Sequence, residues 1–398
     1  MNVALYCPQI TQFGDVYPTI VELTRRSRHT FTLFTHNFDS NAAVAELDGR
    51  KVQILPRIPV DREITSVARA MWTIVSQSLP LEQFDALLVI GEGLGDLIVL
   101  RNRQAPVVCL CLSPLRIAFD PAYREKTLSK WSFTGRWAIE LGCKAFHVVD
   151  FLAWQRFRRV ICVSEGVKGR VLKGWLANHE RLEVARPGSS FETRPGTRVF
   201  ERFFLLPDRL KNSDHLDAIL AAFDDFQKRS QDFADFSLVI CASQMNESSS
   251  ELRSLEQKVA GKRSIELRLN AADSELQDLY RTCYTVISRN DDWPAVALQA
   301  MSFGKPVIAL DCEYAREIVT HGKDGYIEQP DAKALADRMV ALASDPFQAF
   351  VVGLEGFKKA KAFSWDEFIA RVDDMLEDIL PVGHPKAITH GNRIRAAK

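Results

Sequence analysis

The stretch 285–310 places a strand, a polar turn and a helix in an order that suits anion binding. The apolar run 285–288 predicts a strand, and the polar turn 290–294 ends it because Pro294 suits the first turn of a helix. That helix is predicted to end at Gly304, before a second apolar strand. A helix N-terminus at the carboxyl end of a strand offers unpaired backbone N–H groups. We therefore expect a site for an anionic or hydroxyl-rich ligand here.

Two regular series of strands and helices must position this site. Strands are predicted in the first half at 3–7, 30–35, 52–55, 84–90, 107–111 and 160–163, and in the second half at 202–206, 236–242, 265–269, 285–288 and 307–310. Helices and loops separate them, as in doubly wound sheets. A turn-rich linker with two Pro-Gly pairs lies between the halves at 185–196. The predicted fold class is α/β, with two Rossmann-like domains whose parallel sheets carry helices on both faces.

Length and composition narrow the class of protein. The chain has 398 residues, enough for two domains with full cores, and is 46% hydrophobic and 26% charged. Its net charge of zero argues against a nucleic-acid binder. No apolar run is long enough for a transmembrane helix, and no secretory signal is visible, so we expect a cytoplasmic protein.

Metal and disulfide chemistry are not expected. The eight cysteines contain no C-x-x-C pair, and most lie in apolar, strand-like runs, as small buried side chains do in a reducing compartment. The eight histidines have no metal-ligand spacing. We therefore predict no metal and no cofactor.

The stretch 288–327 resembles the donor-binding segment of GT-B fold retaining glycosyltransferases of family 4 (glycosyl transferases group 1). The family pattern has two glutamates eight residues apart, then Gly-x-Pro-Val-Ile and later Glu-Ile-Val. In this sequence, residues 304–308 match the Gly-x-Pro-Val-Ile motif and residues 317–319 match Glu-Ile-Val, at the family's spacing. Asp291 and Gln299 occupy the two glutamate positions.

The resemblance implies a domain organisation. An N-terminal acceptor-binding domain at 1–188 and a C-terminal nucleotide-sugar-binding domain at 198–365 should face a central cleft. A helix at 366–380 should cross back toward the N-terminal domain. The polar residues 381–398 should form a mobile tail.

The resemblance also assigns donor-site residues. Arg209 corresponds to the arginine that holds the donor diphosphate, and Lys211 is a candidate for the second positive charge because Asp214 occupies the family's lysine position. Asp291 should bind the sugar and Gln299 the ribose, and Asp291 and Arg209 are the predicted catalytic residues. The predicted donor-binding residues are Arg209, Lys211, Asn270, Asp291, Asp292, Trp293, Pro294, Ala295 and Gln299.

Acceptor-binding residues are predicted in the first half, at Gly14, Ser113 and Arg116. Arg116 matches a family arginine, whereas Leu112 occupies the position of a family histidine. Two interpretations of Arg116 stay open, namely contact with an anionic or polyhydroxyl acceptor and a surface ion pair.

The resemblance implies transfer of a sugar from a nucleotide-sugar, whose nucleotide is UDP or GDP, with retention of configuration. The acceptor would be a glycan, a lipid-linked molecule or another acceptor, in polysaccharide biosynthesis. The alternative is a catalytically degenerate relative that acts as a binding or partner subunit, because Leu112, Asp214, Asp291 and Gln299 all depart from the family pattern.

Basic and aromatic residues are mixed along a predicted helical stretch at 123–159. This mixture suits an anionic membrane surface, which would make the protein peripheral to the membrane. In the other interpretation the aromatic side chains face the core and the basic ones are solvated.

Overall fold

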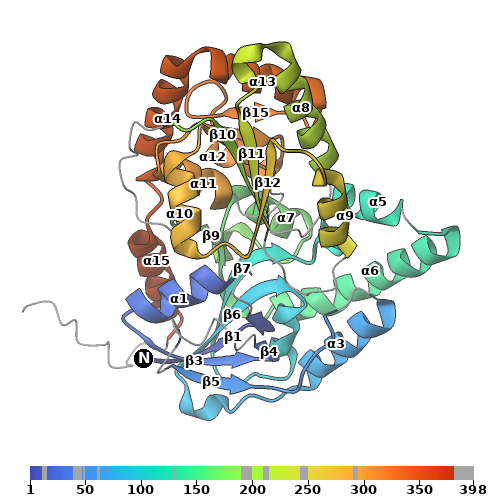
Figure 1. Ribbon diagram of the computed structural model, residues 1–398. Helices are drawn as coiled ribbons and strands as arrows, with labels where there is room; N and C mark the ends of the chain where they lie inside the picture. Colours follow the sequence, from blue (N-terminus) through green and yellow to red (C-terminus); the bar gives the residue numbers. More distant parts are fainter. Residues whose placement is uncertain are drawn as a thin grey trace, which may run out of the picture. The chain divides into compact units, whose positions relative to one another are not determined.

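The computed structural model describes residues 1–10, 16–38, 47, 50–60, 63–129, 131–189, 200–208, 215–242, 250–289 and 295–380. The chain divides into two compact units (Figure 1). Unit 1 contains Met1–Ala185 and the segment from Asp366 onward, and unit 2 contains Arg186–Trp365.

Unit 1 is built on a seven-stranded parallel sheet with the order β5-β3-β1-β6-β7-β8-β9. Its strands are β1 (Asn2–Tyr6), β3 (Thr30–Thr35), β5 (Lys51–Ile54), β6 (Ala86–Gly93), β7 (Val107–Pro114), β8 (Phe157–Cys162) and β9 (Leu182–Val184). The short strands β2 (Gln9–Ile10) and β4 (Asn37–Phe38) pair separately. The central strands are continuous apolar runs because helices cover both faces of such a sheet.

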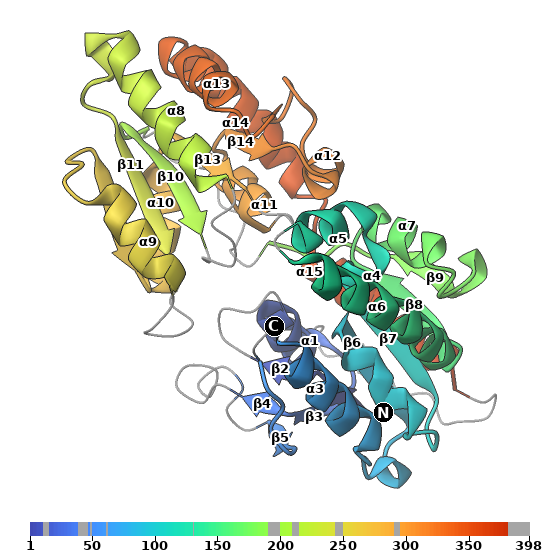
Figure 2. The same ribbon diagram turned by 90° about the vertical axis from the view of Figure 1, so that its right-hand side faces the viewer.

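The helices of unit 1 connect these strands, except for the last helix, which follows unit 2 in the chain (Figure 2). They are α1 (Val16–Arg26), α3 (Ile64–Ser76), α4 (Arg116–Phe119), α5 (Pro121–Leu128), α6 (Phe133–Trp154), α7 (Glu165–Lys173) and α15 (Trp365–Asp378), with 3₁₀ turns η1 (Leu81–Gln83), η2 (Gly95–Leu100) and η3 (His179–Arg181). The prediction of helix through 157–159 is wrong. Residues 157–159 instead begin strand β8, which pairs in parallel with β7, with Phe157 buried and Arg158 exposed.

Unit 2 has a six-stranded parallel sheet with the order β12-β11-β10-β13-β14-β15. The strands are β10 (Phe203–Asp208), β11 (Ser237–Ala242), β12 (Ile265–Leu269), β13 (Thr285–Ser288), β14 (Val307–Leu310) and β15 (Tyr326–Glu328). Its helices are α8 (Leu216–Arg229), α9 (Ser250–Val259), α10 (Asp273–Thr282), α11 (Ala295–Ser302), α12 (Glu313–Ile318), α13 (Ala332–Ser344) and α14 (Pro346–Ala360), with the 3₁₀ turn η4 (Gln231–Phe233).

Each face of the unit 2 sheet has its own hydrophobic layer. Alternate residues of β10 point to opposite faces. Phe204 belongs to a layer with side chains of α8, α9, α13 and α14, whereas Leu205 belongs to a layer with side chains of α10, α11 and α12 and with Ala360 at the end of α14. This double cover explains why the strands of unit 2 lack the polar alternation of a half-exposed sheet.

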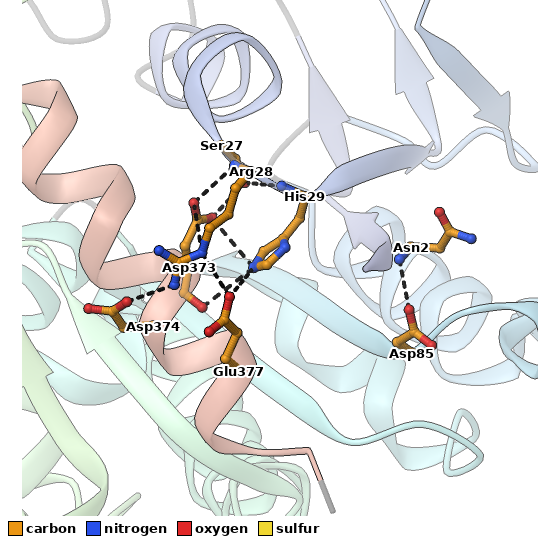
Figure 3. Close-up of polar contacts among 8 residues, drawn as sticks. All are labelled: Asn2, Ser27, Arg28, His29, Asp85, Asp373, Asp374 and Glu377. Atoms are coloured by element: carbon orange, nitrogen blue, oxygen red, sulfur yellow. Dashed lines mark hydrogen bonds and ion pairs between the residues drawn. The ribbon is translucent and has the colours of Figure 1, made fainter. Parts of the chain in front are cut away.

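Helix α15 belongs to unit 1 although it follows unit 2 in the chain. Its Asp373 accepts hydrogen bonds from the Ser27 hydroxyl (2.5 Å) and the Arg28 backbone N–H (3.1 Å), as Figure 3 shows. Arg28 also pairs with Asp374 and Glu377, at 2.7 and 2.8 Å. Polar contacts therefore fasten α15 to the turn between α1 and β3.

Candidate functional site

The winding of the unit 2 sheet changes direction between β10 and β13. These strands are parallel neighbours, with Phe204 opposite Thr285, although α8 to α10 separate them in the chain. In open α/β sheets, ligands bind at the carboxyl edge of such a switch point. The two segments predicted to grip the donor, 209–214 and 290–294, directly follow these two strands.

Most predicted donor residues lie outside the described residues. They are Arg209, Lys211, Asp291, Asp292, Trp293 and Pro294, together with the altered position Asp214. Their roles stay predictions. The structure gives the positions of the strand ends that precede these residues in the chain.

Helix α11 holds the described part of this site. Ala295 begins the helix, and Gln299 lies one turn further, with only 7% of its surface exposed. The Tyr280 hydroxyl donates a hydrogen bond to Gln299 Oε1 at 2.9 Å, and the Tyr280 ring stacks on Phe303. Gln299 is therefore a neutral side chain fixed by a partner on α10, where a glutamate would bring a negative charge.

Asn270 ends strand β12 at the same edge of the sheet. Its backbone φ is 51°, and its N–H donates to the Ala242 carbonyl at 2.9 Å. Asparagine tolerates this left-handed conformation better than most residues, so it suits the sharp turn into α10. The hydrogen bond joins the end of β12 to the end of β11. Asn270 therefore lies two strands away from β10 in the sheet.

In unit 1 the predicted acceptor residues lie where β7 ends. The Ser113 hydroxyl donates to the Pro114 carbonyl at 3.0 Å, and Leu112 is half-buried in the same strand. Arg116 begins α4, with its guanidinium 3.4 Å from Asp120 and 4.5 Å from the Tyr123 ring centre. The ion pair considered for Arg116 is thus present, and its contact with an acceptor stays a prediction. Gly14 lies outside the described residues.

Two polar contacts near the unit 2 site were not predicted from the sequence. One is the Tyr280–Gln299 hydrogen bond, which the tyrosine on the apolar face of α10 could have signalled because a buried hydroxyl needs a partner. The other is the pair Arg186–Glu317, at 3.7 Å, which ties α12 to the start of unit 2.

The electrostatics of the described residues give no second reactive centre in unit 2. Lys305 is buried with its ammonium 4.1 Å from the Phe200 ring centre, and burial lowers its pKa. It precedes β14 at the amino edge of the sheet, opposite the switch-point site.

Within the described ranges, no three His, Cys, Asp or Glu side chains are grouped to hold a metal. Over the same ranges, no helix has both the length and the apolarity to cross a membrane.

Comparisons with solved structures define the fold. Anabaena Alr3699/HepE, solved in complex with UDP and glucose, matches 95% of this chain and 100% of its own, at 15% identity and a TM-score of 0.70. Sucrose-phosphate synthase from Thermosynechococcus elongatus matches 95% of this chain and 98% of its own, at 14% identity and a TM-score of 0.69. The fold is therefore the α/β GT-B fold, as predicted.

The sequence comparisons add a match to one family over part of the chain. Residues 194–364 match the family described as glycosyl transferases group 1. A segment of 123 residues is 28% identical to the D-inositol 3-phosphate glycosyltransferase of Thermobispora bispora, and it spans 30% of this chain and 29% of that protein. The similarity to the group 1 glycosyltransferases thus lies in residues 194–364, which contain most of unit 2.

Proposed function

We propose that the protein is a family 4 glycosyltransferase that moves a sugar from a UDP-sugar to a glycan or lipid-linked acceptor with retention of configuration, in polysaccharide biosynthesis. One observation carries the proposal. Both segments expected to hold the donor leave the unit 2 sheet at the two strands that flank its switch point, inside the region that matches the family. UDP is preferred over GDP because the Anabaena relative was solved with UDP.

The proposed chemistry depends on stabilising a departing diphosphate. Negative charge grows on UDP as the sugar bond breaks, and Arg209 and Lys211 would supply opposing positive charge. The Asp291 carboxylate would bind sugar hydroxyls, and the Gln299 amide would donate to the ribose. The departing phosphate would itself accept the acceptor's proton, which accounts for retention without a separate base. No step requires a metal.

Nucleotide binding is the first test, measured by calorimetry with UDP and GDP. We expect UDP to bind, and hydrolysis of one UDP-sugar in a donor panel to identify the sugar. Arg209→Ala should weaken UDP binding by at least about tenfold, since it removes a charge-assisted contact.

Arg202→Ala is the matched control. Arg202 lies just before the same strand and pairs with Asp235 at 2.6 Å at the other end of β10. Its loss should leave UDP affinity unchanged. Equal affinities for the wild type and Arg209→Ala would show that Arg209 does not grip the diphosphate, and absence of any nucleotide binding would refute the proposed function.

The second candidate is a binding or partner subunit without catalysis. It is favoured by the fixed, neutral Gln299 and by the apolar Leu112 at positions where the family carries ionisable groups. UDP binding without hydrolysis or transfer, across the donor panel and a range of glycan acceptors, would favour this candidate.

A further inference from the structure

Helix α6 exposes an apolar face to solvent. Its large side chains Trp137, Leu141, Val148, Phe151 and Leu152, hereafter the α6 stripe, are 65%, 59%, 63%, 42% and 55% exposed. Their spacing of three, four and seven residues places them on one side of the helix. The opposite side is buried through Phe146, Asp150 and Trp154. A surface helix normally carries polar residues on its outer side, so this stripe marks a contact surface.

The stripe lies in a basic part of the chain. Residues 121–159 contain eight Lys or Arg and three Asp or Glu, one of which is the buried Asp150, whereas the whole chain has a net charge of zero. On the same side of α6 as the stripe, Glu140 and Lys144 are both exposed, so the excess positive charge comes from residues that flank the stripe. Arg136, Arg158 and Arg159 donate to backbone carbonyls, which hold the guanidinium groups in place without neutralising them.

The combination of apolar area and positive charge selects the partner. A second copy of residues 121–159 would bring the same net positive charge to the interface, which opposes association. An anionic lipid surface offers negative head groups and an apolar interior together. Because α6 is not apolar enough to cross a membrane, it would lie in the plane of the surface.

We propose that the α6 stripe docks the protein on anionic lipid bilayers, with its apolar side chains inserted among the lipids and the neighbouring basic residues against the head groups. This deepens the proposed function, and its benefit to catalysis depends on that function, because docking would bring the enzyme to lipid-linked acceptors. The docking itself needs neither donor nor acceptor.

Co-sedimentation of the full chain with lipid vesicles tests the proposal. We expect binding to vesicles of phosphatidylcholine and phosphatidylglycerol in equal parts, weaker binding to phosphatidylcholine alone, and loss of binding at high salt. The variant Leu141→Ser/Val148→Ser/Leu152→Ser should bind at least about tenfold more weakly, since it removes inserted apolar surface. Because these side chains are exposed, its thermal midpoint should match the wild type.

The matched control is Ile54→Ser/Val67→Ser/Trp72→Ser, which removes three exposed apolar side chains from β5 and α3. It should bind vesicles as the wild type does. The proposal fails if the wild type does not sediment with anionic vesicles or if both triple variants bind equally. It also fails if the wild type is a stable dimer in light scattering that the α6 variant dissociates. Calorimetry with UDP tests the proposed function in a separate experiment. The membrane-docking proposal and the proposed function can therefore fail independently.

Discussion

The hydrogen bond between Tyr280 and Gln299 links the proposed ribose-binding side chain to a buried ring. Tyr280→Phe removes the hydroxyl that fixes Gln299 Oε1 at 2.9 Å. We expect it to lower the free energy of unfolding by about 1 kcal/mol, the usual cost of a buried hydrogen bond, and to weaken UDP binding several-fold because the amide is no longer held. Denaturant unfolding and calorimetry measure the two effects.

Tyr284→Phe separates these two effects. Tyr284 lies in the same unit, and its buried hydroxyl donates to the Leu342 carbonyl at 2.8 Å on the other hydrophobic layer. A similar loss of stability with unchanged UDP affinity is expected. If both variants weaken UDP binding equally, Gln299 has no special part in binding.

Two buried carboxyls, Asp96 on η2 and Asp150 on α6, make unit 1 sensitive to pH. Trp154 Nε1 donates to Asp96 at 2.8 Å, and burial followed by the charge of Asp96 raises the pKa of Asp150 well above its ordinary 3.8. The folded state therefore keeps a proton that the unfolded state releases. The resulting stability is complete below pH 3.8 and is lost as the pH rises through the folded-state pKa.

Asp150→Asn should remove this loss because an amide does not ionise. We expect the variant to be more stable than the wild type by about 1 kcal/mol or more near pH 8, with the difference shrinking toward pH 4. Thermal unfolding of both proteins across this range measures it. The exposed Asp374→Asn is the control, and a difference between Asp150→Asn and wild type that does not change with pH would contradict the argument.

At the scale of elements, the attachment of α15 depends on one carboxylate more than on the ion pairs around it. Asp373 is 5% exposed and accepts two hydrogen bonds from the turn before β3, whereas Asp374 is 62% exposed (Figure 3). Asp373→Ala should cost about 2–3 kcal/mol because it removes the buried acceptor of two partly buried hydrogen bonds. Asp374→Ala should cost less than about 1 kcal/mol. Equal costs in chemical denaturation would contradict this assignment.

Strands were predictable from the sequence to a greater degree than helices or polar pairs. Continuous apolar runs such as 285–288 and 307–310 define buried strands, so β13 and β14 form where predicted. Helix α14 was not predicted. It contains Gly353, a poor helix former, which is needed because a Cβ there would lie 2.2 Å from the Gly304 carbonyl oxygen.

The polar pairs could not be read from the sequence because their partners are distant in the chain. Asp96 and Asp150 come together only when α6 packs on η2, and Gln299 meets Tyr280 only when α10 and α11 share a layer. A sequence shows that a buried polar group needs a partner, and the fold selects which one. For the candidate site, the strand ends are observed, whereas the roles of Arg209 and Asp291 rest on resemblance.

At the scale of the whole molecule, the two units differ in chain continuity. Unit 2 is one continuous segment with a hydrophobic layer on each face of its sheet, and its ends meet. Trp365 Nε1 donates to the Ser189 carbonyl at 2.8 Å, and Gly188 packs so closely on Trp365 that a Cβ would lie 2.7 Å from its backbone nitrogen. Unit 1 is discontinuous and is completed by α15.

This difference predicts how the units behave when separated. A fragment of residues 186–365 should unfold cooperatively and bind UDP, because its core and the proposed donor site are complete. A fragment of residues 1–185 should not unfold cooperatively, since it lacks the buried side chains of α15 and of Ile379 just after it, namely Phe368, Ile369, Val372, Met375, Leu376 and Ile379. Their burial contributes about 10 kcal/mol, which is comparable to the whole stability of a domain. Circular dichroism with thermal unfolding measures both fragments. Joining 1–185 to 366–398 through a flexible linker should restore the transition, and a cooperative transition of 1–185 alone would show that α15 is dispensable.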